Sequence, residues 1–328
     1  MPAWSRREAE KTKCKMQNVK RKGSYFSFCI LHSPLCTLHF PDPRALRLEE
    51  VSMFKALEEL RAQVCRPGPR PEVDPQEIQK IKETCVAVLP AGGEGSRLRT
   101  LLGSDAMNKA ALKVGDESLI RRTVRMYRDA GIGRFVALIY HAGASVVEDL
   151  GDGKALGVEV RYSEDPGRPV GRGGAILNAI QTGLLPEGAT LIVHNPDDQI
   201  VRYPGRFVDD ILAGHLQGCR GGAIATVVAV GETPYTYTGL KLEEGRVRTI
   251  ASYPPIPIPT HIGVSLLAPE TFPYFRRMFD LSQRMDFEGV MFPKLVEEDR
   301  LYSVLIPTEC WIAVNDPKGA KRFTEAIS

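Results

Sequence analysis

The chain has 328 residues, of which 43% are hydrophobic and 25% are charged. These are ordinary globular proportions, and they exclude collagen-like, coiled-coil and wholly disordered chains. The net charge of +3 is unevenly distributed: residues 1–53 hold ten Lys and Arg against five Asp and Glu, and the remaining 33 basic and 35 acidic residues sum to −2. Residues 54–328 are therefore nearly neutral and lack the concentration of basic residues that nucleic-acid binding requires, so we expect no nucleic-acid partner.

The seven cysteines are an odd number and include no Cys-x-x-Cys pair. This pattern indicates neither a disulfide framework nor a zinc ribbon, and reduced thiols favour a cytoplasmic protein. No run approaches the roughly 18 apolar residues that a membrane-spanning helix requires. We therefore expect no membrane partner.

The first 52 residues form a basic leader. Within it, residues 24–40 superficially resemble the apolar region of a signal peptide, but Ser, His and Pro interrupt the run and no small-x-small cleavage site follows. We interpret residues 1–52 as a disordered leader or as the product of a start codon placed too early, with Met53 as the alternative start. Residues 53–84 are expected to be a helical N-terminal extension.

From residue 85 the sequence alternates between apolar runs and amphipathic segments, which is typical of an α/β protein. The predicted strands are Cys85–Pro90, Arg134–Tyr140, Val158–Tyr162 and Thr190–His194. The predicted helices are Ser118–Ala130, Ser145–Leu150, Gly173–Thr182 and Arg206–Leu216. Right-handed crossovers between such strands produce a doubly wound, mostly parallel sheet with helices on both faces, a Rossmann-like fold.

After residue 220 the pattern becomes rich in strands. The expected strands lie within 223–230, 238–242, 246–252 and 261–269, followed by helices within 270–298 and a final helix from Pro317. We expect this half to add a mixed sheet to one domain spanning residues 85–328.

A glycine-rich loop, A-G-G-E-G-S-R-L from Ala91 to Leu98, directly follows the first strand. Glycines there let backbone N–H groups approach a phosphate or a base closely, because no Cβ intervenes. The loop lacks the spacing and lysine of a Walker A motif, and Leu98 occupies the third glycine position of a dinucleotide fingerprint. A glycine-rich turn without a ligand is the remaining alternative.

The loop resembles that of the sugar-1-phosphate nucleotidylyltransferases, G-G-x-G-(S/T)-R-L, from Gly92 to Leu98. Further ordered segments are similar to the family: N-K-A-A-L-K-V-G-D-E-S-L-I from Asn108, G-R-G-G-A-I from Gly171, and I-V-H-N-P-D from Ile192. The similarity is strongest to the compact enzymes that act on muramic-acid, heptose or mannose 1-phosphates. It implies nucleotide-sugar biosynthesis, with a nucleotide-binding half over 85–220 and a sugar-binding half over 221–328.

The resemblance also implies roles for individual residues. Nucleotide contacts are expected from Ala91, Gly92, Gly93, Gly95, Ser96 and Arg97. Arg97 and Lys109 are the expected catalytic cations, because an enzyme that joins two polyanions must neutralise charge on the transferring group. Asp197, at the end of an apolar strand, is the expected ligand of Mg²⁺, with Asp198 as a helper. The alternative interpretation of Arg97 and Lys109 is that they are solvated charges in a surface loop. That of Asp197 is an aspartate in the turn that ends a strand.

On the acceptor side, the resemblance places Glu164, Gly173 and Gly174 near the sugar. The alternative role of the two glycines is to allow tight packing at the start of a helix. The alternative for Glu164 is that it is a solvated loop residue. His141 and His194, at strand ends, are interpreted as structural.

Two departures from the family concern activity. Ala313 occupies the position at which the family has a second metal-binding Asp, after a tryptophan. An active enzyme would therefore use a single metal site, or Asp316 or Asp198 would replace the missing carboxylate. The family's Glu-Lys-Pro segment has no counterpart in residues 250–259. We therefore hold two hypotheses, an active Mg²⁺-dependent transferase acting on a nucleoside triphosphate and a sugar 1-phosphate, and a nucleotide-sugar-binding regulatory paralogue. The base, the sugar and the oligomeric state stay open, and a homo-oligomer is one possible state.

Overall fold

The computed structural model of the chain describes residues 57–69, 71–103 and 107–328. The leader over 1–52 and the alternative start at Met53 lie outside these residues. Within residues 53–84, residues 57–64 are helical and a second helix, α2, spans Pro75–Thr84. Asp74 caps α2, because its side chain accepts a hydrogen bond from the backbone N–H of Gln76 at 2.8 Å.

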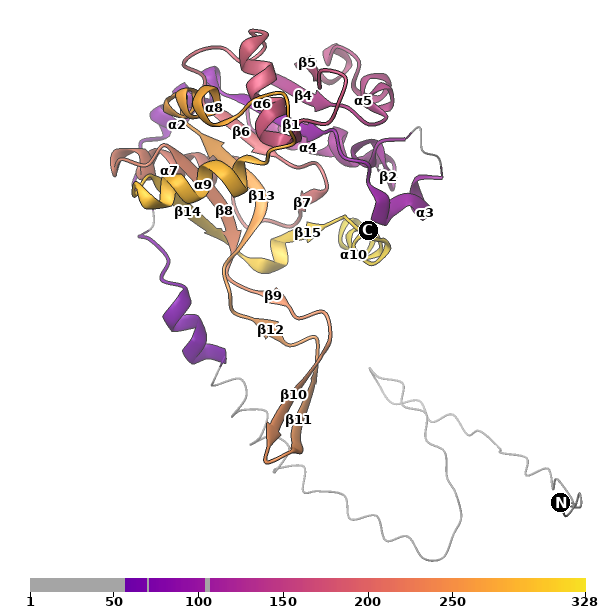
Figure 1. The fold of residues 1–328 in the computed structure, drawn as a ribbon, viewed down its shortest axis with the longest axis vertical. Coiled ribbons are helices and arrows are strands. Elements are labelled where there is room, and N and C mark those ends of the chain that lie inside the picture. Colours follow the sequence, from indigo (N-terminus) through magenta and orange to yellow (C-terminus); the bar gives the residue numbers. More distant parts are fainter. Residues whose placement is uncertain (1–56, 70, 104–106) are drawn as a thin grey trace, which may run out of the picture. The chain divides into compact units, whose positions relative to one another are not determined.

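A seven-stranded sheet forms the centre of the molecule, in the order β14-β8-β13-β6-β1-β4-β5 (Figure 1). Its strands are β1 (Val86–Ala91), β4 (Arg134–Ile139), β5 (Glu159–Glu164), β6 (Leu191–His194), β8 (Ala225–Val230), β13 (Thr260–Leu267) and β14 (Leu301–Ile306). β1 pairs in parallel with both β4 and β6, β4 with β5, and β8 with β14, whereas β13 is antiparallel to both of its neighbours. The predicted mostly parallel, mixed sheet is confirmed.

Helices cover both faces of this sheet. One face packs against α2, α4 (Leu119–Asp129), α5 (Gly143–Leu150) and α7 (Phe207–Arg220), and the other against α6 (Gly171–Gln181), α8 (Phe272–Met278) and α9 (Phe287–Glu297). Alternate residues of β1 divide between the two cores, Ala87 and Leu89 in one, Val86 and Val88 in the other. A strand buried on both faces reads as a continuous apolar run, which is why β1 was predictable.

Helix α4 lies within the predicted helix Ser118–Ala130 and carries a stripe of Ile120, Val124 and Tyr127, all completely buried. Ser118 caps this helix: its Oγ accepts a hydrogen bond from the backbone N–H of Arg121 at 3.1 Å. The stripe packs α4 into the core, and the cap defines where the helix begins.

The second half differs from expectation in two respects. Strand β14 was not predicted, and β8, β13 and β14 extend the first half's sheet instead of forming another around it. The segments β10 (Thr238–Glu243) and β11 (Arg246–Ser252) stand outside that sheet as a two-stranded ribbon. Most of their side chains are exposed, so the ribbon has no apolar face buried against the main sheet.

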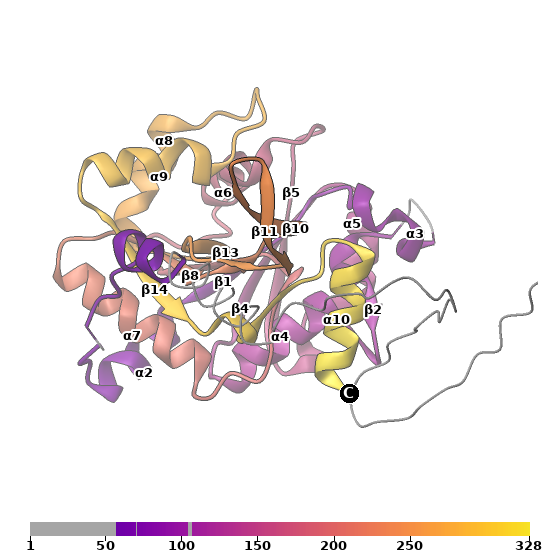
Figure 2. The same cartoon turned by 90° about the horizontal axis from the view of Figure 1, so that it is seen from below.

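Several short elements complete the described fold. They are α3 (Arg99–Leu102), β2 (Lys113–Val114), β3 (Glu117–Ser118), β7 (Asp198–Ile200), β9 (Thr233–Pro234), β12 (Pro255–Ile256), β15 (Trp311–Ala313) and α10 (Pro317–Ile327). Seen from below, α10 runs beside α4 and β2 (Figure 2). There Phe323 packs into a third core that includes Leu98 of the glycine-rich loop, so the C-terminal helix supports that loop. No described helix is both long and apolar enough to cross a bilayer.

Candidate functional site

The sheet has a topological switch point between β1 and β6. From β1 the chain proceeds to β4 and β5 on one side, then returns to form β6 on the other side of β1. In open α/β sheets, a crevice opens outside the carboxyl ends of the strands at such a point. The glycine-rich loop follows β1 and Asp197 follows β6, so the two principal predicted motifs meet there.

Gly95 gives the loop its shape. Its φ of +61° lies in the left-handed region, and a Cβ built on it would lie 2.9 Å from the Cβ of Lys109. The backbone N–H of Leu98 then donates to the carbonyl oxygen of Gly95 at 2.8 Å, which closes a 3₁₀ turn over Ser96–Leu98. This turn buries Leu98 and leaves the side chains of Ser96 and Arg97 exposed.

Arg97 makes no hydrogen bond or ion pair with any other residue that the structure describes. Its guanidinium carries five N–H donors in a planar fork. An exposed arginine on a loop beside backbone donors is therefore available to an anionic ligand.

Lys109 and Asp197 form the central contact of the site. The ammonium Nζ lies 2.6 Å from the carboxylate Oδ2 of Asp197, and the two side chains are 23% and 11% exposed. The lysine stem also passes the loop, because a Cβ built on Gly93 would lie 3.8 Å from its Cε. The structure thus brings together the predicted Gly93, Gly95, Lys109 and Asp197.

Asn108 was missed by the sequence interpretation, although it positions the turn that carries Lys109. It is completely buried, and its Nδ2 donates to the carbonyl oxygens of Ala91 and His141, each at 2.7 Å. Its Oδ1 accepts from the backbone N–H of Ala110 at 2.9 Å. One side chain therefore ties the ends of β1 and β4 to the turn that carries Lys109.

Asp198 lies beside Asp197 and accepts two hydrogen bonds. Its Oδ1 accepts from Nε1 of Trp311 at 3.0 Å, and its Oδ2 accepts from Nδ2 of Asn195 at 3.2 Å. Burial, together with the charge of Asp197, raises the pKa of Asp198 to about 7, while Lys109 acts in the opposite direction. A cation placed here would favour the ionised form of Asp198.

Gly263, at a bend in β13, was also missed. Its φ is +72°, and a Cβ built on it would lie 2.2 Å from Oδ2 of Asp198 and 2.3 Å from Nδ2 of Asn195. Only glycine lets the backbone approach the carboxylate this closely. Neither the positive φ of Gly263 nor its closeness to Asp198 in the folded chain produces a recognisable pattern in the neighbouring sequence.

The position of the family's second metal ligand is next to this pair. Ala313 on β15 is the register partner of Asp198 on β7. Asp316 instead accepts from the backbone N–H of Gly319 at 2.7 Å and caps α10, so its carboxylate already has a structural role. Of the two substitutes considered, Asp198 is the one that lies beside Asp197.

The carboxylates of Asp197 and Asp198 suit a hard cation that takes most of its other ligands from the substrate and from water. The described residues contain no group of three or more His, Cys, Asp or Glu that could hold a metal by themselves. Mg²⁺ typically takes one or two carboxylates and fills its other positions with phosphate oxygens and water. Asp197 and Asp198 fit that requirement.

A family model described as nucleotidyl transferase matches residues 86–316, most of the chain. The chain belongs to this family. Two curated relatives match shorter stretches. One is a bifunctional IPC transferase and DIPP synthase from Rubrobacter xylanophilus, 32% identical over 180 residues, which are 53% of this chain and 36% of that protein. The other is an N-acetylmuramate alpha-1-phosphate uridylyltransferase from Neisseria meningitidis serogroup B, 34% identical over 113 residues.

The second match covers 34% of this nucleotidyl transferase and 46% of the Neisseria protein, so the chain matches less than half of either relative's length. A crystal structure from Bacillus anthracis, described as a glucose-1-phosphate thymidylyltransferase in complex with a sucrose, superimposes with a TM-score of 0.57. The match covers 74% of this chain and 94% of that one at 17% identity. At that identity the similarity supports the fold alone, and it confirms the Rossmann-like nucleotidyltransferase fold.

Glu164, Gly173 and Gly174, the predicted sugar contacts, lie on β5 and α6 of the nucleotidyl transferase. Glu164 is exposed at the end of its strand. Both glycines are buried: a Cβ on Gly173 would lie 2.2 Å from Cε1 of Phe279, and one on Gly174 would lie 2.7 Å from Cβ of Val170. Their surroundings support the packing alternative, and none of the three has a contact with Lys109 or Asp197 among the described interactions.

His194 is completely enclosed beneath the site. Its Nδ1 lies 2.9 Å from the hydroxyl of Tyr127, and its Nε2 donates to the backbone carbonyl of Asp198 at 2.6 Å. Burial lowers the pKa of His194 to about 4, so the ring is neutral at physiological pH. It supports the aspartate loop, in agreement with the structural interpretation. His141 is half-buried and contributes its backbone carbonyl to Asn108.

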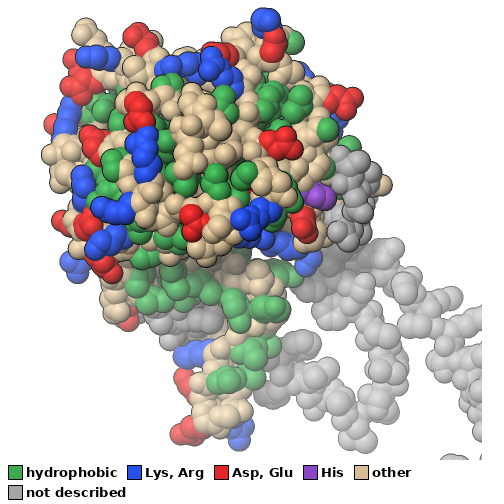
Figure 3. Space-filling model, turned by 45° about the horizontal axis from the view of Figure 1, so that its top comes forward, with side chains coloured by type: hydrophobic (Ala, Val, Ile, Leu, Met, Phe, Trp, Pro, Cys, Tyr) green, Lys and Arg blue, Asp and Glu red, His purple; other side chains and the backbone are tan. Residues whose placement is uncertain are grey.

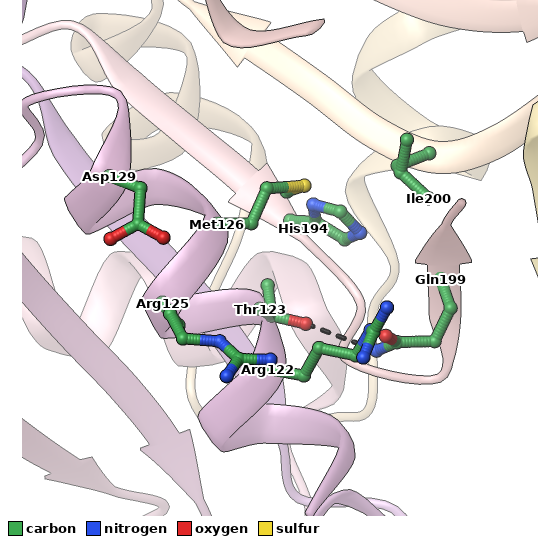
Figure 4. A pocket seen from close by; sticks show the side chains of 8 residues that line it. All are labelled: Arg122, Thr123, Arg125, Met126, Asp129, His194, Gln199 and Ile200. Carbon is green, nitrogen blue, oxygen red and sulfur yellow. Dashed lines mark hydrogen bonds between the residues drawn. The ribbon is translucent and has the colours of Figure 1, made fainter. Parts of the chain in front are cut away.

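A pocket of about 150 Å³ lies below His194, between α4 and β7 (Figure 4). It is lined by Arg122, Thr123, Arg125, Met126, Asp129, His194, Gln199 and Ile200. Nε2 of Gln199 already donates to Oγ1 of Thr123 at 3.2 Å, and Arg125 pairs with Glu117 at 2.6 Å. The pocket contains none of the predicted site residues, so we place the candidate active site at the switch point.

Proposed function

We propose that the chain is a sugar-1-phosphate nucleotidylyltransferase (EC 2.7.7.-) that moves a nucleotidyl group from a nucleoside triphosphate to a sugar 1-phosphate. The observation that carries this proposal is the Lys109–Asp197 contact, held against a glycine-rich loop at the switch point. The name of the Neisseria relative, an N-acetylmuramate alpha-1-phosphate uridylyltransferase, supports the substrate class. Reduced thiols favour a cytoplasmic enzyme.

The reaction needs positioning more than acid–base catalysis. An oxygen of the sugar phosphate bonds to the α-phosphorus of the triphosphate, the bond to the bridging oxygen breaks, and pyrophosphate leaves with the electron pair. A phosphate monoester has its second pKa near ~6, so the nucleophile is already ionised at neutral pH. The transfer therefore needs no general base.

The residues of the site then have distinct tasks. Backbone N–H groups of Gly92, Gly93 and Gly95 approach the nucleotide, and the exposed Arg97 holds oxygens of the triphosphate. Lys109 directs a second positive charge toward the transferring phosphoryl group, where charge stabilisation lowers the barrier. Asn108 positions Lys109 without touching a substrate.

Asp197 and Asp198 are the residues that would hold Mg²⁺. When bound, the ion neutralises phosphate charge and orients the triphosphate. In its absence, Lys109 compensates the charge of Asp197. On the acceptor side, Glu164 is proposed to meet sugar hydroxyls, and Gly173 and Gly174 to place the start of α6 close to the sugar.

A second candidate function is a regulatory paralogue that binds a nucleotide sugar without turnover. The residue that favours this function is Ala313, which lies opposite Asp198 in the pairing of β15 with β7. Because alanine has no carboxylate, Asp197 and Asp198 have no third acidic partner at that position. Loss of a metal-coordinating group commonly reduces rates while the fold persists.

A pyrophosphate-release assay separates the two functions. The wild-type chain is incubated with Mg²⁺, each of UTP, GTP, CTP and dTTP, and a panel of sugar 1-phosphates, with pyrophosphatase and colorimetric phosphate detection. Release that requires both substrates supports the transferase. Nucleotide-sugar binding in calorimetry without any release would overturn it in favour of the regulatory function.

A further inference from the structure

Exposed hydrophobic side chains are concentrated in one segment of the molecule. Residues 233–258, here called the arm, contain β9, β10, β11 and β12. Thirteen large hydrophobic side chains are exposed among the described residues, and eight of them belong to the arm. These eight are Tyr235, Tyr237, Leu240, Leu242, Val247, Ile250, Tyr253 and Ile258. Such a concentration marks an interaction site more often than a solvated surface.

Strand register gathers four of these residues on one face. Leu240 lies opposite Ile250, and Leu242 lies opposite Val247 across a bulge. Directly opposed residues of an antiparallel pair point to the same side, and residues two apart along a strand do too. Leu240, Leu242, Val247 and Ile250 therefore form a continuous aliphatic face, and they are 52%, 61%, 50% and 63% exposed.

The ribbon of β10 and β11 also has open edges. Within the described residues these strands pair only with each other, and they extend away from the central sheet (Figure 1). Figure 3 shows hydrophobic side chains gathered over this projecting part. An isolated two-stranded ribbon is marginally stable in water, and unpaired strand edges promote association. The arm therefore requires a cover that the described residues of its own domain do not supply.

The exposed apolar surface of the whole arm is close in size to one side of a specific protein interface, and the four residues of the aliphatic face supply part of it. From the exposed fractions, the eight side chains present roughly 600 Å² of surface. The largest apolar patch of a typical monomer is about 300–600 Å², and a standard interface buries about 800 Å² on each partner. The arm, together with the backbone around it, thus approaches one side of a standard interface.

Charge at the end of the ribbon indicates which partner fits. The tip carries Lys241, Arg246 and Arg248 against Glu243 and Glu244, and Arg248 pairs with Glu243 at 3.3 Å. A tip with a net charge of only +1 gives little attraction for an anionic membrane or a nucleic acid, and little repulsion between identical copies. Two-fold association requires a self-complementary patch, which an aliphatic face with a mixed-charge tip provides.

We propose that the arm is a dimerisation element: the aliphatic face of Leu240, Leu242, Val247 and Ile250 packs against the same face of a second copy of this chain. The catalytic site at the switch point lies on other elements. The proposal therefore rests on the exposed residues of the arm and not on the proposed function.

Sedimentation velocity of the full chain over a hundredfold concentration range tests this proposal. The test variant combines Leu240→Glu with Ile250→Lys, which removes apolar surface but places opposite charges directly across the ribbon and so preserves its pairing. The control is Val296→Glu, a 64% exposed hydrophobic residue on α9 outside the arm. We expect wild type and control to dimerise, and the arm variant to have at least a tenfold weaker dimer constant with an unchanged far-ultraviolet spectrum.

Amide hydrogen exchange of the wild-type chain provides a second test that does not depend on a variant. Protection of residues 238–252 is expected to increase with protein concentration, while protection of β1 stays constant. A wild-type monomer at every concentration, or an arm variant that dimerises like wild type, overturns the proposal. Binding of a monomeric wild type to phosphatidylcholine vesicles, lost in the arm variant, would also overturn it and assign the arm to a membrane.

Discussion

The ammonium of Lys109 lies 2.6 Å from Oδ2 of Asp197, a residue 88 positions further along the chain. The contact joins the turn after the glycine-rich loop to the end of β6, across the switch point of the sheet. It places the cation and the carboxylate of the candidate site together before any ligand binds.

Replacing Lys109 with Met is expected to reduce kcat at least about tenfold, which corresponds to roughly 1.4 kcal/mol of transition-state stabilisation. The methylene stem keeps its place beside Gly95, and only the charge is lost. Lys113→Met, at an exposed lysine on β2, is the matched control. Steady-state kinetics decide the matter, and an unchanged kcat in the Lys109 variant would remove this lysine from the catalytic machinery.

Arg97→Ala is expected to reduce kcat by a similar factor of at least about ten. Since its guanidinium has no partner among the described residues, its removal should leave the melting temperature unchanged. Arg322→Ala, at an exposed arginine on α10, controls for the loss of one surface charge. Equal turnover by both variants would contradict a triphosphate contact from Arg97.

Gly173→Ala tests how α6 is packed. The added methyl group would meet the ring of Phe279 at 2.2 Å, so we expect the free energy of unfolding to fall by about 1–3 kcal/mol. Gly289→Ala, in α9, has open space for its methyl group and should be neutral or slightly stabilising. Urea denaturation measures both. Wild-type stability with impaired acceptor binding in Gly173→Ala would instead favour a sugar contact at this position.

His215 should make stability sensitive to mild acid. It is buried, its Nδ1 lies 2.9 Å from Oγ1 of Thr226, and burial lowers its pKa from 6.5 to about 4. Below pH 6.5 the unfolded chain binds a proton that the folded chain excludes, so stability falls as the pH falls toward 4.

From pH 7 to pH 5, this one group should cost wild type roughly 2 kcal/mol relative to His215→Gln, which cannot titrate there. Chemical denaturation at the two pH values provides the comparison. Parallel loss of stability in wild type and variant would show that His215 is not buried in its neutral form.

The features that were predictable from the sequence are those with a local signal. The buried strand β1, its glycine-rich loop and the amphipathic helix α4 follow from apolar runs, glycine spacing and helical periodicity. Strand β14 was missed because most of its side chains are only half-buried at the sheet edge, so neither a continuous apolar run nor a clear alternation marks it.

The supporting residues of the site had no such signal. Asn108 acts by joining the ends of β1 and β4, which are separate in sequence and meet only in the folded sheet. Gly263 is required by its approach to Asp198, also a tertiary relationship. The arm was read as two strands of a sheet, because its sequence alternates like that of a strand packed on one face. The sequence of a strand does not show which surface covers its apolar face, because that surface belongs to another part of the assembly.

The most direct test of the proposed site compares pyrophosphate release by wild type and by Asp197→Asn. The variant keeps the shape of the side chain but removes the charge that faces Lys109 and would hold Mg²⁺. We expect release by wild type only with a nucleoside triphosphate, a sugar 1-phosphate and Mg²⁺ together, and at least about tenfold slower release by the variant. Equal rates for the two proteins, with the variant folded as wild type, would contradict a catalytic site centred on Lys109 and Asp197.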